Sequence, residues 1–204
     1  MNSHEIPSPS GPAAPTGEDT GSVRDTVVEA ADRLFYERGI QQVGMDELRA
    51  AAGVSLKRLY AEFEGKDAIV LAVLRRRHAM WVRGIDDAVD RHHDGREKLL
   101  GIFDFLATWF ATDDFRGCAF INAFGELGGT SERVAQAARE HKQSFQVYVD
   151  GLVADLGAPE TLARQLVLLA EGAQTTSAIT GDPTAAHHAR EAAEVLISAA
   201  TAPA

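Results

Sequence analysis

The sequence predicts an all-α protein of about nine helices, in which a three-helix helix-turn-helix domain precedes a larger helical domain. Apolar residues recur at spacings of three and four from Ser22 almost to the end of the 204-residue chain, as in amphipathic helices. No segment alternates apolar and polar residues as a half-buried strand does, and no Asn-Gly hairpin signal occurs.

The first half of the chain predicts four helices. Ser22 followed by Asp25 resembles a helix-starting pair, and Gly39 ends the helix that begins there. Two short helices flank a turn at residues 53–55, and a longer helix begins near Lys66. These helices are expected at about residues 22–38, 45–52, 56–63 and 66–88.

The second half predicts four or five more helices, separated by glycine-containing turns. The segment 117–127 is apolar almost all round, so it is expected to be buried. The helices are expected at about residues 96–112, 117–127, 131–156, 160–180 and 182–200. The expected division is a disordered tail (1–21), a first domain (22–67) and a second domain (68–204).

Composition is that of a globular protein with a core, with 45% hydrophobic and 25% charged residues. Cys118 is the single cysteine, so no internal disulfide is possible and a cytoplasmic setting is expected. The sequence has no run of about 18 apolar residues, so no membrane-spanning helix is expected. Residues 1–21 contain four prolines and lack the basic and apolar regions of a signal peptide.

Charge is unevenly distributed along the chain. The net charge is −10, so the molecule as a whole repels nucleic acid. Residues 22–80 nevertheless carry ten cations against nine acids, whereas residues 81–204 carry ten against eighteen. The near-neutral segment contains Lys57 and Arg58 at the start of a short helix, which indicates a local cationic surface.

Two short helices joined by a glycine turn are typical of a helix-turn-helix, whose second helix lies in the DNA major groove. Gly53 allows the left-handed backbone of a sharp turn, and Ser55 can cap the second helix, whose N-terminus favours phosphate. Arg58 in its first turn can pair with guanine. Tyr60 and Lys66 can reach backbone phosphates.

Residues 24–74 resemble the N-terminal domain of the TetR/AcrR family of transcriptional repressors. The matching positions are Ala31, Leu34, Phe35, Gly39, residues 52–55, Leu59, Tyr60, Phe63, Lys66 and Asp67. The resemblance implies a homodimer that binds a palindromic operator and is released by a small molecule bound in the second domain. Residues 116–127 also resemble a segment found in some C-terminal domains of the family.

Three departures from the family pattern affect the expected DNA contacts. Arg49 replaces a small residue, so it either touches phosphate or alters the helix crossing. Lys57-Arg58 replaces a frequent Gly-Thr pair, which changes the expected base sequence, and Glu62 opposes phosphate. The expected DNA contacts are Arg49, Ser55, Leu56, Lys57, Arg58, Tyr60 and Lys66.

A small-ligand site is expected among the aromatic residues of the second domain, because such sites are apolar with a few convergent polar groups. The alternative is that the aromatic residues are core and the polar groups are structural. Cys118 is either a small apolar residue or a sensor. The candidate contacts are Trp81, Phe103, Trp109, Phe110, Cys118, Asn122, Glu126, His141, Phe145, Tyr148, Gln174 and Thr175.

The last two helices are rich in small residues, which permit close helix packing and predict a four-helix dimer interface. The alternative is a hairpin within one chain. The candidate interface residues are Leu162, Leu166, Leu169, Ala173, Ala189, Ala193 and Leu196.

No catalytic, cofactor or metal site is expected. The pairs His92-His93 and His187-His188 are adjacent, so their side chains diverge on a helix. No zinc, phosphate-loop or HExxH spacing occurs. The run 75–77 of three arginines is interpreted as a solvated face or as salt bridges to the acidic half.

The leading hypothesis is a ligand-responsive transcriptional repressor acting as a homodimer on DNA, with the helix beginning near Lys66 as the lever between domains. The alternative is a helical small-molecule-binding protein or enzyme with a non-functional DNA domain.

Overall fold

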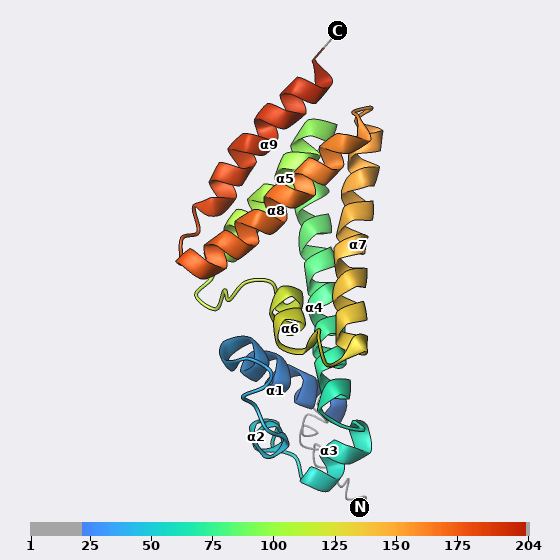
Figure 1. The fold of residues 1–204 in the computed structure, drawn as a ribbon, viewed down its shortest axis with the longest axis vertical. Coiled ribbons are helices and arrows are strands. Elements are labelled where there is room, and N and C mark those ends of the chain that lie inside the picture. Colours follow the sequence, from blue (N-terminus) through green and yellow to red (C-terminus); the bar gives the residue numbers. More distant parts are fainter. Residues whose placement is uncertain (1–21, 203–204) are drawn as a thin grey trace, which may run out of the picture.

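The computed structural model describes residues 22–202, which form nine helices and no strand (Figure 1). The expected tail at residues 1–21 lies outside the described residues. The all-α prediction is confirmed. The helices are α1 Val23–Arg38, α2 Met45–Ala51, α3 Leu56–Glu62, α4 Lys66–Val89, α5 Gly95–Phe110, α6 Ala119–Leu127, α7 Glu132–Asp155, α8 Glu160–Thr180 and α9 Ala185–Thr201. Within the described range, no helix is both long enough and apolar enough to cross a membrane.

Side-chain caps set several helix starts. Ser22 Oγ accepts a hydrogen bond from the Asp25 N–H at 3.1 Å, and Ser131 Oγ accepts one from Val134 N–H at 3.4 Å. Asp94 caps α5 in the same way, through the N–H groups of Arg96 and Glu97. These caps use donors that have no partner within their own helix.

The helices share two hydrophobic clusters. The first joins α1, α2, α3 and the N-terminal half of α4 to α6 and the start of α7. The second joins the C-terminal half of α4 to α5, α7, α8 and α9. In Figure 1, α4 and α7 run side by side along the long axis and therefore contribute to both. The division at residues 67 and 68 stays a prediction; in the structure the first cluster continues to Ala138.

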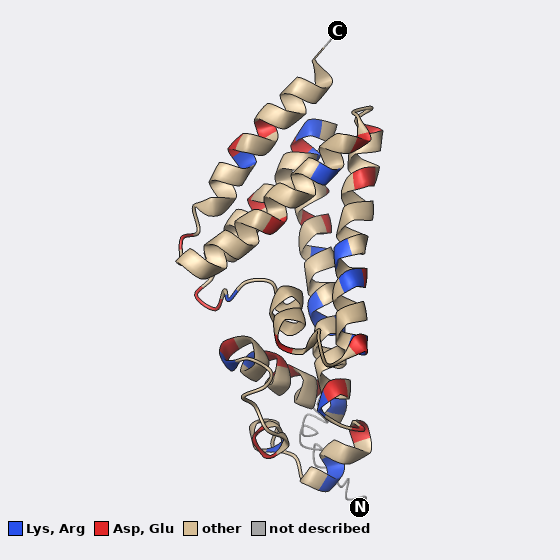
Figure 2. Cartoon of the chain, in the orientation of Figure 1, with Lys and Arg blue, Asp and Glu red and all other residues tan. Residues whose placement is uncertain are grey.

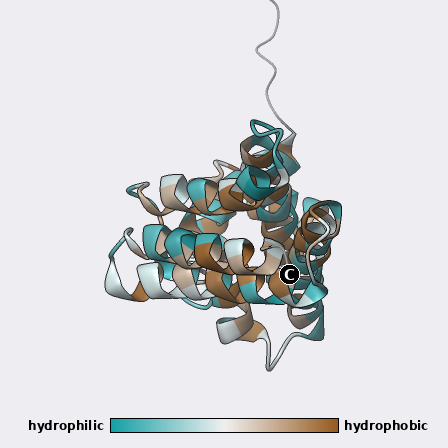
Figure 3. Cartoon of the chain, turned by 90° about the horizontal axis from the view of Figure 1, so that it is seen from above, coloured by the Kyte–Doolittle hydropathy of each residue, from teal (hydrophilic) through white to brown (hydrophobic). Residues whose placement is uncertain are grey.

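Polar and apolar residues lie on different faces of the same helices and are not segregated into different parts of the chain. Figure 2 shows both signs of charge in both parts of the molecule, and Figure 3 shows hydrophilic and hydrophobic residues on the same helices. Each helix thus has one buried face, as amphipathic periodicity predicts.

The expectation that segment 117–127 is buried holds for only one face of the helix. In α6 only Phe120 and Ala123 are buried, whereas Phe124 is 50% exposed and Ile121 is also exposed. The helix packs one face against α4 and α7 and leaves the other open. The sequence of this segment could not distinguish the two faces, because its residues are apolar almost throughout and show no helical period.

Candidate nucleic-acid interface and ligand cavity

The turn between α2 and α3 is closed by backbone hydrogen bonds. The N–H of Gly53 donates to Ala50 O at 3.2 Å, and the N–H of Val54 donates to Arg49 O at 3.0 Å. Gly53 has φ +65°, in the left-handed region that side chains with a Cβ disfavour. The glycine therefore permits the sharp turn after α2 that sets the direction of α3.

Helix α3 is anchored on one face and open on the other. Leu59 is fully buried against the core that also contains Leu48 of α2. Ser55 caps the helix, because its Oγ accepts from Arg58 N–H at 3.3 Å. The expected contact residues Leu56, Lys57, Arg58 and Tyr60 all lie on exposed positions of this helix.

On the exposed face of α3, Lys57 and Arg58 are cations that are available to bind DNA. Two nearby arginines are paired with acids, Arg38 with Glu47 and Arg49 with Asp46, the latter at 2.8 Å. Within the described part of the chain, neither Lys57 nor Arg58 forms an ion pair. Figure 2 shows cationic residues on α3 at the lower end of the molecule, away from the second cluster.

Of the other two expected cationic DNA contacts, Arg49 is paired with Asp46 and Lys66 is half-buried. Arg49 lies on the outer face of α2, where a phosphate would compete with Asp46 for its guanidinium. Lys66 is half-buried at the start of α4, and burial lowers the pKa of its ammonium group, opposed by the charges of Glu126 and Asp67. These two residues are therefore less available than Lys57 and Arg58.

Helix α1 is attached to both ends of α6. Tyr36 Oη donates to Gly117 O at 2.7 Å and accepts from the Arg116 N–H at 2.9 Å. At the other end, the Glu126 carboxylate accepts from the N–H groups of Ile40 and Gln41, both at 2.8 Å. These hydrogen bonds therefore connect both ends of α6 to α1 and to the segment that leads into α2.

Asn122 and Glu126, expected as ligand contacts, have structural hydrogen-bond partners instead. Asn122 Nδ2 donates to Arg116 O at 3.0 Å, and Glu126 holds the α1–α2 connection. Their positions correspond to the alternative interpretation of structural polar groups.

The arginine run on α4 also contacts α1. Arg77 Nε donates to Asp32 Oδ1 at 2.5 Å, and the Arg77 guanidinium lies 4.0 Å above the Tyr36 ring. Arg76 lies 3.7 Å from the same carboxylate. The salt bridges expected to the acidic second half instead join α4 to the first domain.

A cavity of about 180 Å³ lies between α4, α5, α6 and α7. Aromatic rings surround it: Trp81 lies 5.4 Å from Phe105 and 5.5 Å from Trp109, centroid to centroid. On the opposite wall, Phe120 stacks on His141 at 3.7 Å. The lining residues are Arg77, Met80, Trp81, Phe105, Trp109, Cys118, Ala119, Phe120 and His141.

Four expected ligand residues line this cavity: Trp81, Trp109, Cys118 and His141. The site prediction missed Arg77, Met80, Phe105, Ala119 and Phe120. A sequence signal for two of them exists, because Arg77, Met80 and Trp81 follow the i, i+3, i+4 spacing of one helical face.

The remaining expected ligand residues lie elsewhere. Phe103 and Phe110 are buried in the second cluster, and Thr175 is exposed on α8. Phe145 and Tyr148 line a separate recess of about 220 Å³. Gln174 is buried, and its Oε1 has no hydrogen-bond partner among the described residues.

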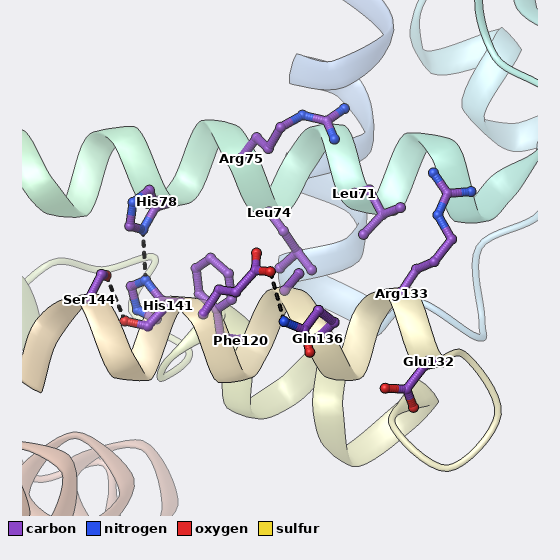
Figure 4. Close-up of a pocket in the computed structure, with 12 residues that line it drawn as sticks. Leu71, Leu74, Arg75, His78, Phe120, Glu132, Arg133, Gln136, His141 and Ser144 are labelled. Atoms are coloured by element: carbon purple, nitrogen blue, oxygen red, sulfur yellow. Dashed lines mark hydrogen bonds between the residues drawn. The ribbon is translucent and has the colours of Figure 1, made fainter.

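A larger, open groove of about 760 Å³ runs between α4 and α7 (Figure 4). It shares Phe120 and His141 with the aromatic-lined cavity, so these two rings separate the two spaces. His141 Nδ1 lies 3.0 Å from His78 Nδ1. Burial, with smaller contributions from Lys142 and His78, lowers the pKa of His141 to about 3, so its ring is neutral at pH 7.

Cys118 is buried, with its Sγ 3.5 Å from Lys142 Nζ. Lys142 in turn pairs with Glu171 at 2.5 Å. Over the described residues, no group of three or more His, Cys, Asp or Glu side chains is placed to hold a metal ion.

The α8–α9 hairpin packs against α5 and buries most of the expected interface residues within the chain. Buried in this way are Leu162, Leu166, Ala173, Ala189 and Ala193, with Leu169 and Leu196 partly buried. The large apolar side chains that remain exposed on this hairpin are Leu168, Ile179 and Val195. The small residues thus pack this hairpin internally, while these three face outward.

Two family models match the chain. Residues 27–73 match the model described as bacterial regulatory proteins of the tetR family, and residues 95–193 match the tetracyclin repressor-like C-terminal domain. The first matched segment contains the helix-turn-helix formed by α2 and α3. The second contains α5 and α6, which contribute four of the side chains that line the cavity.

Curated relatives align over part of their length. The HTH-type transcriptional activator FasR of Mycolicibacterium smegmatis is 37% identical over 87 residues, which are 41% of this chain and 40% of FasR. The HTH-type transcriptional regulator TtgR of Pseudomonas putida is 30% identical over 96 residues, 45% of this chain and 46% of TtgR. The chain thus matches less than half the length of each.

Solved structures align over nearly their whole length. SCO4454, a TetR-family transcriptional regulator from Streptomyces coelicolor, has a TM-score of 0.83 and 27% identity over 88% of this chain and 96% of its own. A TetR regulator from Streptomyces avermitilis has a TM-score of 0.78 and 30% identity over 88% and 98%. With its N-terminal helix-turn-helix and C-terminal helical domain, the chain belongs to the TetR family of bacterial transcriptional regulators.

Proposed function

We propose that this chain is a ligand-responsive repressor that binds a palindromic operator as a homodimer. The observation that carries the proposal is the pair of exposed cations Lys57 and Arg58 in the first turn of α3, neither of which has an acidic partner among residues 22–202. They lie on the open face of a helix whose other face is anchored by Leu59. This is the geometry required of a helix that enters the major groove.

The exposed face of the α8–α9 hairpin supports a dimer. Leu168, Ile179 and Val195 are large apolar side chains left in solvent by the single chain. Burying them against a second copy would stabilise a twofold-symmetric interface. A dimer would place two α3 helices in successive major grooves about 34 Å apart.

The aromatic-lined cavity supports a small-molecule effector. It is lined by the N-terminal part of α6, whose C-terminal Glu126 holds the connection into α2. An effector that binds only one position of α6 would shift the population away from the DNA-competent arrangement.

Operator binding is tested by a gel shift with DNA upstream of the chain's own gene. Lys57→Ala with Arg58→Ala is expected to lower operator affinity at least ~100-fold, since each lost base contact costs ~1–3 kcal/mol and the dimer loses both copies. Unchanged affinity in this variant would overturn the assignment of α3.

The matched control is Arg83→Ala with Arg91→Ala, which removes the same charge from exposed positions at and just beyond the far end of α4. The control is expected to bind the operator as the parent chain does. A transcriptional reporter then separates repression from activation, because the relative FasR carries the name of an activator.

A further inference from the structure

The size of the aromatic-lined cavity suits a ligand with a single ring. Its volume is about 180 Å³. An engineered apolar cavity of ~150 Å³ in another protein binds benzene. The cavity described here therefore has room for one aromatic ring with a small substituent.

The lining restricts the ligand's shape and charge. Trp81, Phe105 and Trp109 form one wall and Phe120 the other, so a planar ring can make edge and face contacts on both sides. Among the described residues, Arg77 is the only Lys, Arg, Asp or Glu that lines the cavity. Its guanidinium already donates to Asp32, so a ligand anion can bind it only in competition with that carboxylate, and a ligand cation would be repelled.

Arg77 is also the residue that ties α4 to α1. Its side chain is 18% exposed and that of Asp32 is 12% exposed, so both charges are largely removed from water. Arg77 and Met80 line both the cavity and a shallow recess between α1 and α4, which Asp32 and Tyr36 also line. These two side chains therefore separate the cavity from the DNA-binding domain, and Met80 is 45% exposed.

We propose that the effector is a small monocyclic aromatic acid whose carboxylate competes with Asp32 for the Arg77 guanidinium. The inference rests on the proposed function and adds the chemical class of the ligand and its point of action. When the ligand carboxylate binds Arg77, Asp32 retains only the longer contact with Arg76, at 3.7 Å. Helix α1 then loses its short ion pair to α4, and the helix-turn-helix is released from the position that binds DNA.

The ligand class is tested by fluorescence titration of the full-length chain. Its two tryptophans, Trp81 and Trp109, both line the cavity, so intrinsic fluorescence reports occupancy directly. Benzoate is expected to quench this signal saturably, with a Kd at least ~10-fold lower than that of benzamide, and benzylammonium is expected not to bind. Equal binding of benzoate and benzamide, or preference for benzylammonium, would overturn the proposal.

The role of Arg77 is tested in a charge-balanced variant. Arg77→Gln with Asp32→Asn removes both partners, so that no unpaired buried charge is left to unfold the chain. This variant is expected to lose the preference for benzoate over benzamide, while Arg75→Gln, at an exposed position of α4 outside the cavity, keeps it. Retained benzoate preference in the double variant would show that Arg77 is not the anion ligand.

The competition itself is tested by Asp32→Asn alone. Freed from its partner, Arg77 is expected to bind benzoate several-fold more tightly, and the operator is expected to bind more weakly without any ligand. If Asp32→Asn leaves benzoate affinity unchanged, the competition is refuted.

Failure of this inference and failure of the proposed function give different results. If the parent chain binds its operator and benzoate does not release it, the effector class is wrong and the repressor function stands. If benzoate binds selectively through Arg77 and the chain has no operator, the ligand assignment stands and the proposed function falls.

Discussion

Two runs of adjacent cations, Lys57-Arg58 on α3 and Arg75-Arg76-Arg77 on α4, have opposite surroundings in the folded chain. Lys57 and Arg58 face solvent without an acidic partner among the described residues, whereas Arg76 and Arg77 turn toward Asp32. The difference teaches that a run of cations does not by itself indicate a nucleic-acid contact. The position of acids on neighbouring helices decides whether such charge is available to a partner.

The largest stability effect is expected from Arg77→Met. Removing one partner of a largely buried ion pair leaves Asp32 with only the longer contact to Arg76 and should lower the free energy of unfolding by about 3 kcal/mol. Urea unfolding measures this loss, and adding Asp32→Asn should recover most of it. Lys57→Ala with Arg58→Ala should change stability by less than about 0.5 kcal/mol. A loss as large as that of Arg77→Met would contradict the difference between solvent-facing cations on α3 and paired cations on α4.

The free energy of unfolding is expected to depend on pH, by about 2 kcal/mol, because of His141, which lines the cavity together with Arg77. Its pKa in the folded chain is about 3, below the ordinary value of 6.5, so the unfolded chain binds the proton first. Stability from the neutral ring is complete above pH 6.5 and falls as the pH drops, by about 2 kcal/mol at pH 5. Urea unfolding at both pH values should show this drop in the parent chain and a smaller one in His141→Gln.

A somewhat smaller loss, of about 1.5 kcal/mol, is expected from Glu126→Gln. The variant replaces a carboxylate that accepts two backbone N–H bonds, at 2.8 Å each, with a neutral amide. Because the bonds hold the entry to α2, operator affinity should also fall several-fold. Glu132→Gln, at an exposed position of α7, serves as the control, and equal effects of the two variants would argue against a coupling role for Glu126.

Among the substitutions expected to destabilise the chain, Gly53→Ala has the smallest effect, a loss of about 1 kcal/mol in the free energy of unfolding. A Cβ at Gly53 meets no atom within 4 Å, so the cost comes only from the left-handed backbone at φ +65°. Thermal unfolding should show a small decrease, and operator binding should weaken if the turn relaxes. An increase in stability would show that the turn tolerates another conformation.

Helix positions were predicted well where caps and breaks are local. The predicted helix at 160–180 coincides with α8, which ends at a left-handed Gly181. The last helix was expected from residue 182 but begins at Ala185. The Asp182 carboxylate accepts from both the N–H and the hydroxyl of Thr184, which holds these residues in a turn.

The lining of the aromatic cavity was predicted only in part, and the assignment of a ligand to it stays a prediction. Trp81, Trp109, Cys118 and His141 line the cavity, whereas the equally aromatic Phe103 and Phe110 belong to the core. Residue type is the same in both groups, so composition cannot separate them. The packing of four helices against one another determines which rings border an empty space.

The amino-acid sequence alone determined the helices, the glycine turn at residue 53 and the cationic start of α3, because hydrogen bonds and periodicity within a helix depend on neighbouring residues. The tertiary structure decided which charges are paired and which aromatic rings enclose a cavity. Asp32 and Arg77 are 45 positions apart, and Ile40 and Glu126 are 86 apart. Such contacts exist only after the helices have packed, because burial and distance between remote residues are properties of the folded chain.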